Sequence, residues 1–328
     1  MRLETVTVVG GGAWGTALAQ AAAMAGRPVS LVARNSATVF EIASTRTNQR
    51  YLGDLVLHEA ITARAEFLPG DIVIMAVPAQ ATRGALQAID PAHLAGRPVV
   101  LTAKGLETGT LARQSEILAD MAPEAVPYVL SGPSFAADVA AGRPTAVTLA
   151  GDGASDTSAL AAALAGPSLR PYAADDRIGV EIAGALKNVY ALACGAVEGA
   201  QLGLSARSAL MARAYAETAR IVTAMGGSAT TLTGLAGLGD LTLSCTTPQS
   251  RNYQFGLALG RGETAEAILA GGAKLAEGVA TAPVAASLAM RHEVDAPLID
   301  AVNRLLTGRN TINEIVAGLM ARPLKRET

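Results

Sequence analysis

Short apolar runs alternate with helix-like segments over the first half of the chain. Near-continuous apolar or β-branched stretches predict buried strands at residues 5–9, 28–32, 71–78, 98–103, 128–130, 145–150 and 169–172. Strands that are apolar throughout are typical of a parallel sheet covered by helices on both faces. This half is therefore predicted to be an α/β domain with a mostly parallel sheet.

The second half follows a helical period, and strand-like runs cease at about residue 178. Within 180–195, the apolar side chains that follow the spacing of a core-facing helix are Ile182, Leu186, Val189, Tyr190 and Ala193. We therefore predict two domains, an α/β domain at 1–178 and an all-α domain at 179–328.

Two details of the helical half bear on the site. Ser250 is a good N-cap for a helix over 251–259 that ends at Gly260. A loop is expected at 276–281, before two amphipathic helices and a short charged tail from Pro323.

Composition and charge narrow the class of protein. Half of the 328 residues are hydrophobic, and the net charge is -2 with the signs interspersed, so nucleic acid and anionic membranes are not expected as partners. Cys194 and Cys245 make neither a disulfide framework nor a zinc site, and no metal is expected. We find no secretory signal and no apolar run of about twenty residues, which predicts a cytoplasmic protein without membrane insertion.

Lys187 is the most unusual residue of the predicted helix. From Val180 to Val197 the only other charge is Glu181, and small residues share the stripe of Lys187: Ala183, Gly184, Ala191 and Cys194. A helix that is apolar nearly all round is buried, and a buried lysine indicates chemistry. The alternative is a solvated surface lysine.

A glycine-rich turn follows the first predicted strand and opens a helix. Gly10, Gly12 and Gly15 fit the G-x-G-x-x-G pattern, in which the glycines allow a tight turn, approach of a pyrophosphate and helix–strand packing. This predicts a dinucleotide site, and the alternative is a turn that binds nothing.

Two basic residues stand just past predicted strands, at the edge where open α/β sheets bind ligands. Arg34 replaces the acidic residue that selects NAD, so NADP is expected as cofactor besides NAD, with NADPH favoured. Lys104 is a candidate contact for an anion or a hydroxyl. Both could instead be ordinary surface residues.

A glycine-rich stretch in the helical half carries a single carboxylate, Asp240, and leads to Ser250, Arg251 and Asn252. Free backbone N–H groups at a helix N-terminus, with a hydroxyl, a guanidinium and an amide, suit a phosphate. A capped helix with an exposed arginine would explain Ser250 but not the glycine-rich approach.

Taken together, these motifs resemble bacterial-type NAD(P)-dependent glycerol-3-phosphate dehydrogenase. The resemblance runs from Val6 to about Leu319, through the segments 10–18, 104–107, 131–136, 184–189, 237–241 and 250–252. It implies a Rossmann-like N-terminal domain, a helical C-terminal domain, and interconversion of sn-glycerol 3-phosphate and dihydroxyacetone phosphate between them, supplying phospholipid synthesis. It leaves a homodimer open.

The resemblance also implies residue roles. Lys187 is the proton acceptor, and the substrate contacts are Lys104, Gly132, Ser134, Lys187, Asp240, Ser250, Arg251 and Asn252. The cofactor contacts are Gly10, Gly12, Trp14, Gly15, Arg34, Tyr51, Lys104, Ala136, Arg251, Leu275 and Glu277. Two departures from the family pattern are Gly53, where proline is usual, and Asp138, where glutamate is frequent.

The chemistry agrees with these roles. A lysine accepts the proton of an alcohol only when its pKa falls toward the working pH, and burial beside a second ammonium group acts in that direction. Lys187 and Lys104 are the expected pair, with Asp240 as the orienting carboxylate. Two alternatives remain: a related β-hydroxyacid dehydrogenase, whose substrate lacks the phosphate, and a non-catalytic NAD(P)-binding redox sensor.

Overall fold

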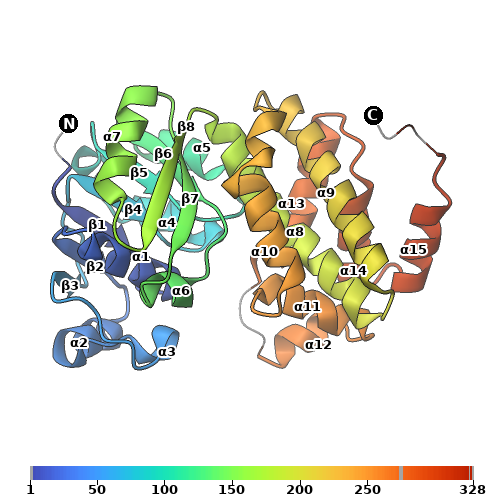
Figure 1. Ribbon diagram of the computed structural model, residues 1–328, viewed down its shortest axis with the longest axis horizontal. Coiled ribbons are helices and arrows are strands. Elements are labelled where there is room, and N and C mark those ends of the chain that lie inside the picture. Colours follow the sequence, from blue (N-terminus) through green and yellow to red (C-terminus); the bar gives the residue numbers. More distant parts are fainter. Residues whose placement is uncertain (1–2, 273–275, 325, 327–328) are drawn as a thin grey trace.

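The computed structural model describes residues 3–272, 276–324 and 326. In its N-terminal part eight strands form one sheet in the order β3-β2-β1-β4-β5-β6-β7-β8 (Figure 1). The strands are β1 (Val6–Val9), β2 (Val29–Val32), β3 (Ile61–Arg64), β4 (Ile72–Met75), β5 (Pro98–Leu101), β6 (Val126–Ser131), β7 (Thr145–Ala150) and β8 (Leu169–Ala174). All neighbours are parallel except β6 and β7. The predicted mostly parallel sheet is confirmed.

Helices cover the sheet because its strands are apolar on both sides. Val8 belongs to one buried cluster and Val9 to another, since successive strand residues point to opposite faces. The elements between the strands are α1 (Ala13–Met24), α2 (Ser36–Thr45), α3 (Gln49–Leu52), η1 (Ala79–Ala81), α4 (Thr82–Gln87), η2 (Pro91–His93), α5 (Gln114–Met121), α6 (Ala136–Ala140) and α7 (Ala154–Leu164).

The edge strand β3 has no counterpart among the predicted strands. It pairs with β2, but of its four residues only Ile61 is buried. An edge strand with one buried residue carries too little apolar signal to be distinguished from a loop.

All described elements after β8 are helical. They are α8 (Arg177–Gly199), α9 (Leu204–Ala224), η3 (Ala229–Thr233), η4 (Leu235–Gly239), α10 (Asp240–Thr246), α11 (Arg251–Gly260), α12 (Ala265–Ala270), α13 (Glu277–Arg291), α14 (Pro297–Leu306) and α15 (Ile312–Met320). The helical part lies beside the sheet part, with the two described ends of the chain at opposite sides of the molecule (Figure 1).

Helix α8 runs through the middle of the helical part and contacts α9, α10, α11 and α13. Ile182, Leu186, Val189 and Tyr190 are fully buried, as the helical spacing predicts. By length and composition α8 could cross a membrane, although Glu181 and Lys187 interrupt its apolar sequence. However, 89% of its most apolar window is buried inside the protein, and its position at the centre of a helical bundle explains its apolarity.

Close helix packing explains the abundance of small residues. A Cβ atom on Gly256 would clash with the backbone carbonyl of Leu192, and one on Gly260 with that of Ala196. Helix α11, which begins after the Ser250 cap as predicted, therefore lies directly against the backbone of α8.

The predicted loop at 276–281 is wrong, because α13 begins at Glu277. Gly278 gives this segment its loop-like composition, but it is needed for packing: a Cβ atom there would lie 2.5 Å from the Asn188 carbonyl oxygen. Three helices follow residue 276 instead of two, since α15 is separate from α14.

Candidate active site

The predicted ligand edge of the sheet is formed by four neighbouring parallel strands. The glycine turn follows β1, Arg34 follows β2, Ala79 follows β4 and Lys104 follows β5. Because these strands are parallel neighbours, the four segments lie along one edge, where open α/β sheets bind ligands.

The glycine turn has the geometry of a dinucleotide site. Gly10 has a φ of 124°, and a Cβ atom there would clash with the Ala76 carbonyl; one on Gly15 would clash with the Gly10 carbonyl. A Cβ atom on Gly12 would meet nothing within 4 Å. Packing thus requires two of the glycines, while the third leaves open space before the N-terminus of α1, which suits a pyrophosphate.

The other predicted cofactor contacts lie around this turn. Arg34 is exposed, Tyr51 on α3 is 43% exposed, and Ala136 is the first residue of α6, which packs against α1. The indole Nε1 of Trp14 is buried and has no hydrogen-bond partner in the described part of the chain. Leu275 lies outside the described residues.

Two lysines and one aspartate form the centre of the site. The Nζ atom of Lys187 donates to Oδ1 of Asp240 at 2.7 Å, and the Nζ atom of Lys104 donates to Oδ2 at 2.7 Å. Lys187 also donates to Oγ of Ser244 at 2.8 Å, and Lys104 to the Gly132 carbonyl at 3.0 Å. One fully buried carboxylate therefore holds both ammonium groups, as expected for the pair.

The glycine-rich stretch before Asp240 explains how the carboxylate reaches the lysines. Residues Leu235–Gly239 form one turn of π-helix, which leads directly into α10 at Asp240. A Cβ atom on Gly237 would clash with the Leu232 carbonyl. Glycine lets this wide turn pack tightly, and single π turns are frequent at functional sites.

Burial and mutual charge set the ionisation of the cluster. Burial lowers the pKa of Lys104 to about 8, and the positive charge of Lys187 adds to this, against the opposing effect of Asp240. Burial alone would raise the pKa of Asp240, but the ammonium groups of Lys104 and Lys187 hold it below its usual range. Asp240 is therefore an anion at neutral pH, and Lys104 can lose its proton near the working pH.

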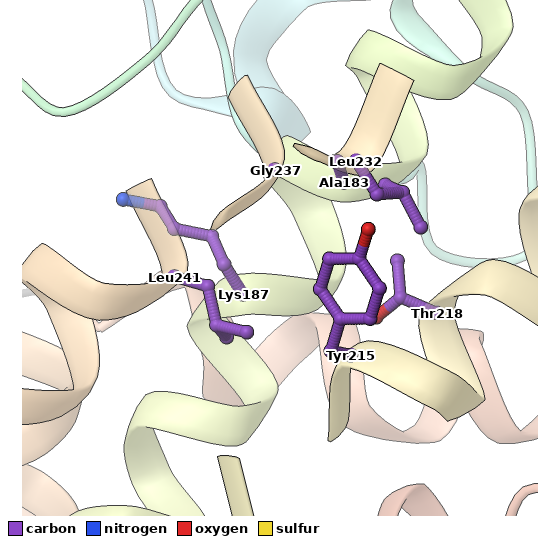
Figure 2. A pocket seen from close by; sticks show the side chains of 7 residues that line it. All are labelled: Ala183, Lys187, Tyr215, Thr218, Leu232, Gly237 and Leu241. Carbon is purple, nitrogen blue, oxygen red and sulfur yellow. The ribbon is translucent and has the colours of Figure 1, made fainter. Parts of the chain in front are cut away.

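The room beside Lys187 is smaller than its small neighbours suggest. At Gly184 a Cβ atom would lie 2.8 Å from Oγ of Ser131, so protein atoms fill that space. Figure 2 shows side chains that line a small cavity, among them Lys187, whose Nζ atom points away from Tyr215 and Thr218. The cavity has about 10 Å³ of room for water, enough for roughly one molecule.

The predicted phosphate seat is only partly free to bind a ligand. The Ser250 hydroxyl accepts the backbone N–H of Tyr253 as an N-cap, and Arg251 is exposed at the first turn of α11. Asn252 is buried; its amide donates to Oδ1 of Asn188 and its Oδ1 accepts the Gly278 N–H, both at 2.9 Å. Asn252 thus holds neighbouring elements together, and Arg251 is the exposed residue of the three.

Glu277 brings the helical part to the sheet edge. Its side chain accepts the backbone N–H of Ala79, just past β4, at 3.3 Å. Burial raises the pKa of Glu277, although the positive charges of Arg251, Lys187 and Lys104 oppose that shift. These three cations and Glu277 therefore share one electrostatic environment between the two parts of the molecule.

Glu181 ties the beginning of α8 to the sheet domain. The Glu181 carboxylate accepts the Ser115 backbone N–H at 2.8 Å, the Ser115 hydroxyl at 2.6 Å and Nη1 of Arg113 at 3.0 Å. These bonds fix the helix that carries Lys187 against the N-terminus of α5.

Sequence reasoning missed Asn188 and Ser244. Asn188 donates to the Lys104 carbonyl at 2.8 Å, and Ser244 accepts from Lys187. Ser244 follows Asp240 by four residues on a helix, a spacing that places both side chains on one face and could have identified it. Asn188 is next to Lys187 in the chain, but no spacing rule distinguishes it.

Further groups in the described residues do not form a metal site. No group of three or more histidine, cysteine, aspartate or glutamate side chains there could hold a metal ion. Cys194 and Cys245 are buried free thiols in contact with each other.

Comparison with known proteins places the chain in a family. The model of the NAD-dependent glycerol-3-phosphate dehydrogenase N-terminus matches residues 5–157, and that of the C-terminus matches residues 176–317. Glycerol-3-phosphate dehydrogenase [NAD(P)+] of Parvibaculum lavamentivorans is 46% identical over 98% of both chains, and that of Caulobacter vibrioides is 47% identical over 100% of both.

A solved structure agrees with these relatives. The crystal structure of glycerol-3-phosphate dehydrogenase from Coxiella burnetii is 35% identical, with a TM-score of 0.89 over 98% of this chain and 100% of that one. The family resemblance and the predicted fold class are therefore confirmed, and the chain belongs to the NAD(P)-dependent glycerol-3-phosphate dehydrogenase family.

Proposed function

We propose that this protein is an oxidoreductase that interconverts sn-glycerol 3-phosphate and dihydroxyacetone phosphate by hydride transfer with NAD(P). The observation that carries the proposal is the buried Asp240 carboxylate with an ammonium group on each oxygen, at the sheet edge where the glycine turn also lies. The activity for which relatives along the whole chain are named supports the same reaction.

Lys187 is proposed as the acid and base of the reaction. The nicotinamide, when bound, supplies or accepts the hydride at the substrate carbon. In the reducing direction Lys187 gives a proton to the carbonyl oxygen, and in the oxidising direction it accepts the hydroxyl proton. Asp240 and Ser244 hold its Nζ atom in one place.

Lys104 is proposed as the second positive group at that oxygen. Its charge would stabilise the negative charge that develops on the oxygen during hydride transfer. Gly132 and Ser134 are proposed as substrate contacts beside it, since the Gly132 carbonyl accepts bonds from both Lys104 and Ser134 at 3.0 Å.

The substrate phosphate is proposed to bind at the start of α11. Arg251 is exposed there and can offer two parallel N–H groups to phosphate oxygens. Ser250 caps the helix and keeps a hydroxyl hydrogen free to donate, while Asn252 supports the turn through Asn188 and Gly278.

NADPH is proposed as the favoured cofactor form, with NADH also accepted. The exposed Arg34 at the end of β2 suits a 2′-phosphate, and no acidic residue stands there to select the 2′-hydroxyl of NAD. Gly10, Gly12 and Gly15 would hold the pyrophosphate, and the remaining contacts are proposed as Trp14, Tyr51, Lys104, Ala136, Arg251, Leu275 and Glu277.

The cellular role follows from the product. We propose that the enzyme supplies glycerol 3-phosphate for phospholipid synthesis in the cytoplasm, without membrane insertion or nucleic-acid partners. A homodimer is proposed as its assembly, which sedimentation of the purified protein tests directly.

One assay tests the proposed reaction. Oxidation of NADPH is followed with dihydroxyacetone phosphate, with dihydroxyacetone and with a small 2- or 3-oxo acid. Turnover with the phosphate ester alone is expected. Turnover with the oxo acid would identify a β-hydroxyacid dehydrogenase, and tight NADPH binding without any turnover would identify a redox sensor.

A further inference from the structure

Asn48 is a buried polar residue in an otherwise exposed segment. It lies at the N-terminal end of α3 and is 0% exposed, while the next two residues, Gln49 and Arg50, are exposed. Burying a carboxamide costs free energy unless its polar atoms are hydrogen-bonded, so its contacts indicate what the residue is for.

The carboxamide faces the glycine turn. Its Nδ2 atom donates to the Gly11 carbonyl at 3.1 Å and to the Thr16 hydroxyl at 2.8 Å. Because a carbonyl only accepts, the contact to Gly11 determines which end of the carboxamide faces the turn. The C=O of Gly11 and the N–H of Gly12 belong to one planar trans peptide, so holding the carbonyl toward Asn48 directs the N–H away from it.

The backbone of the same residue starts the turn that carries Tyr51. The Asn48 carbonyl accepts the N–H of Tyr51 at 3.0 Å and that of Leu52 at 2.8 Å. Helix α3 in turn contacts α6, which begins at Ala136. Asn48 therefore connects two segments that sequence reasoning assigned separately to the cofactor.

The other end of the carboxamide is unpaired. Oδ1 of Asn48 is buried and has no hydrogen-bond partner in the described part of the chain. A buried unpaired acceptor costs stability. The carboxamide is thus better explained by what its N–H groups hold in place than by a contribution to folding.

We propose that Asn48 is a positioning residue of the dinucleotide site. Its side chain sets the Gly11–Gly12 peptide and its backbone sets Tyr51, so that the glycine turn and α3 are held in a constant relation before the cofactor arrives. This rests on the cofactor site proposed above. Preorganisation of this kind acts on cofactor affinity and leaves the chemical step unchanged.

The test compares Asn48→Leu with Thr16→Val. Both changes remove one partner of the same buried hydrogen bond, but only Asn48→Leu releases the Gly11 carbonyl. Asn48→Leu is expected to raise the Kd for NADPH about tenfold, while kcat at saturating NADPH and the KM for dihydroxyacetone phosphate stay within about twofold. Thr16→Val should leave the Kd within about twofold, even where its Tm falls equally.

Two further variants keep the test decisive. Asn48→Ser replaces the leucine variant if that protein does not fold, because its short hydroxyl cannot reach Gly11 and the same rise in Kd is expected. Gly12→Val places its side chain in the proposed pyrophosphate space, because a Cβ atom at Gly12 points into open space and meets nothing within 4 Å.

Each outcome has one meaning. If Gly12→Val abolishes NADPH binding and the Asn48 variants bind it normally, the positioning role is overturned and the cofactor site stands. If Gly12→Val binds NADPH as the wild type does, the cofactor site itself is elsewhere. A fall in kcat equal to the fall in affinity would assign Asn48 a general structural role.

Discussion

The glycine turn and the lysine–aspartate cluster are built in opposite ways. The turn is one continuous stretch, and its shape comes from backbone: Gly10 and Gly15 are required by contacts with carbonyl groups nearby. The cluster joins side chains of Lys104, Lys187 and Asp240, which come from a loop after β5, from α8 and from α10. Its geometry depends on how distant segments pack.

This difference separates binding from chemistry. A backbone turn offers N–H groups whose ionisation never changes, which suits a cofactor that must bind and leave over a range of conditions. The cluster offers groups whose protonation depends on burial and on one another, which suits proton transfer. Changes at the cluster should therefore affect kcat, and changes around the turn should affect cofactor affinity.

The largest effect is expected for Lys187→Met. The proton transfer is lost, so kcat should fall by at least ~10²–10⁴. The fold should remain, because Lys104 still neutralises Asp240, and the Kd for NADPH should barely change. Measuring kcat, Kd and Tm on one preparation tests this; a kcat within a few-fold of wild type would make Lys187 a structural residue.

A smaller effect is expected for Arg34→Ala, which lies in the proposed cofactor site around the glycine turn. The KM for NADPH should rise far more than that for NADH. The difference should correspond to a loss of ~1.5–3 kcal/mol of binding free energy, the worth of a hydrogen bond to a charged group. Arg34 is exposed, so Tm should not change. Steady-state kinetics with both cofactors decide the matter, and equal effects on the two would exclude a role in reading the 2′-phosphate.

The same contrast explains what could be predicted from the sequence. Seven of the eight strands, the strand–glycine turn–helix order and the Ser250 cap depend on local pattern, and the structure confirms them; β3 is the strand that was missed. The burial expected for Lys187 from its nearly all-apolar helix is only partly met, because its side chain is 11% exposed. The pairing of both lysines with Asp240 was expected on chemical grounds and is present.

The missed features depend on packing between distant segments. The start of α13 at Glu277 looks like a loop in the sequence because of Gly278. That glycine is needed for contact with α8 and not for a loop. Asn48 and Asn188 look like ordinary polar residues until the fold places a backbone carbonyl in front of each. No local pattern contains that information.

The pH dependence of the reaction tests whether the protonation of Lys104, in the lysine–aspartate cluster, controls the rate. Its pKa is lowered to about 8, so its positive charge is lost as the pH rises through that value. The kcat/KM for dihydroxyacetone phosphate reduction should then fall, by up to about tenfold per pH unit. In Lys104→Met this inflection near pH 8 should be absent; its persistence would assign it to another group.

The same shift predicts a change in folding stability. The unfolded chain keeps the ordinary lysine pKa of 10.5 and binds this proton more tightly than the folded protein does. The contribution of Lys104 to the free energy of unfolding is therefore unfavourable below pH 8 and improves as the pH rises from about 8 to 10.5. Denaturant unfolding of wild type and Lys104→Met across that range measures the difference.

The smallest effect is expected for Arg251→Lys, at a site that combines a charged side chain with backbone N–H groups. Arg251 is a side chain, but it stands at a helix N-terminus whose backbone N–H groups also face the proposed phosphate. A lysine keeps the charge but cannot form two parallel hydrogen bonds, so the KM for dihydroxyacetone phosphate should rise by roughly tenfold, the worth of one such bond. The ratio of the KM values for the phosphate ester and for dihydroxyacetone separates this loss from a general change in the site. An unchanged ratio would move the phosphate away from α11, whereas a larger fall in kcat than in affinity would place Arg251 with the lysine–aspartate cluster.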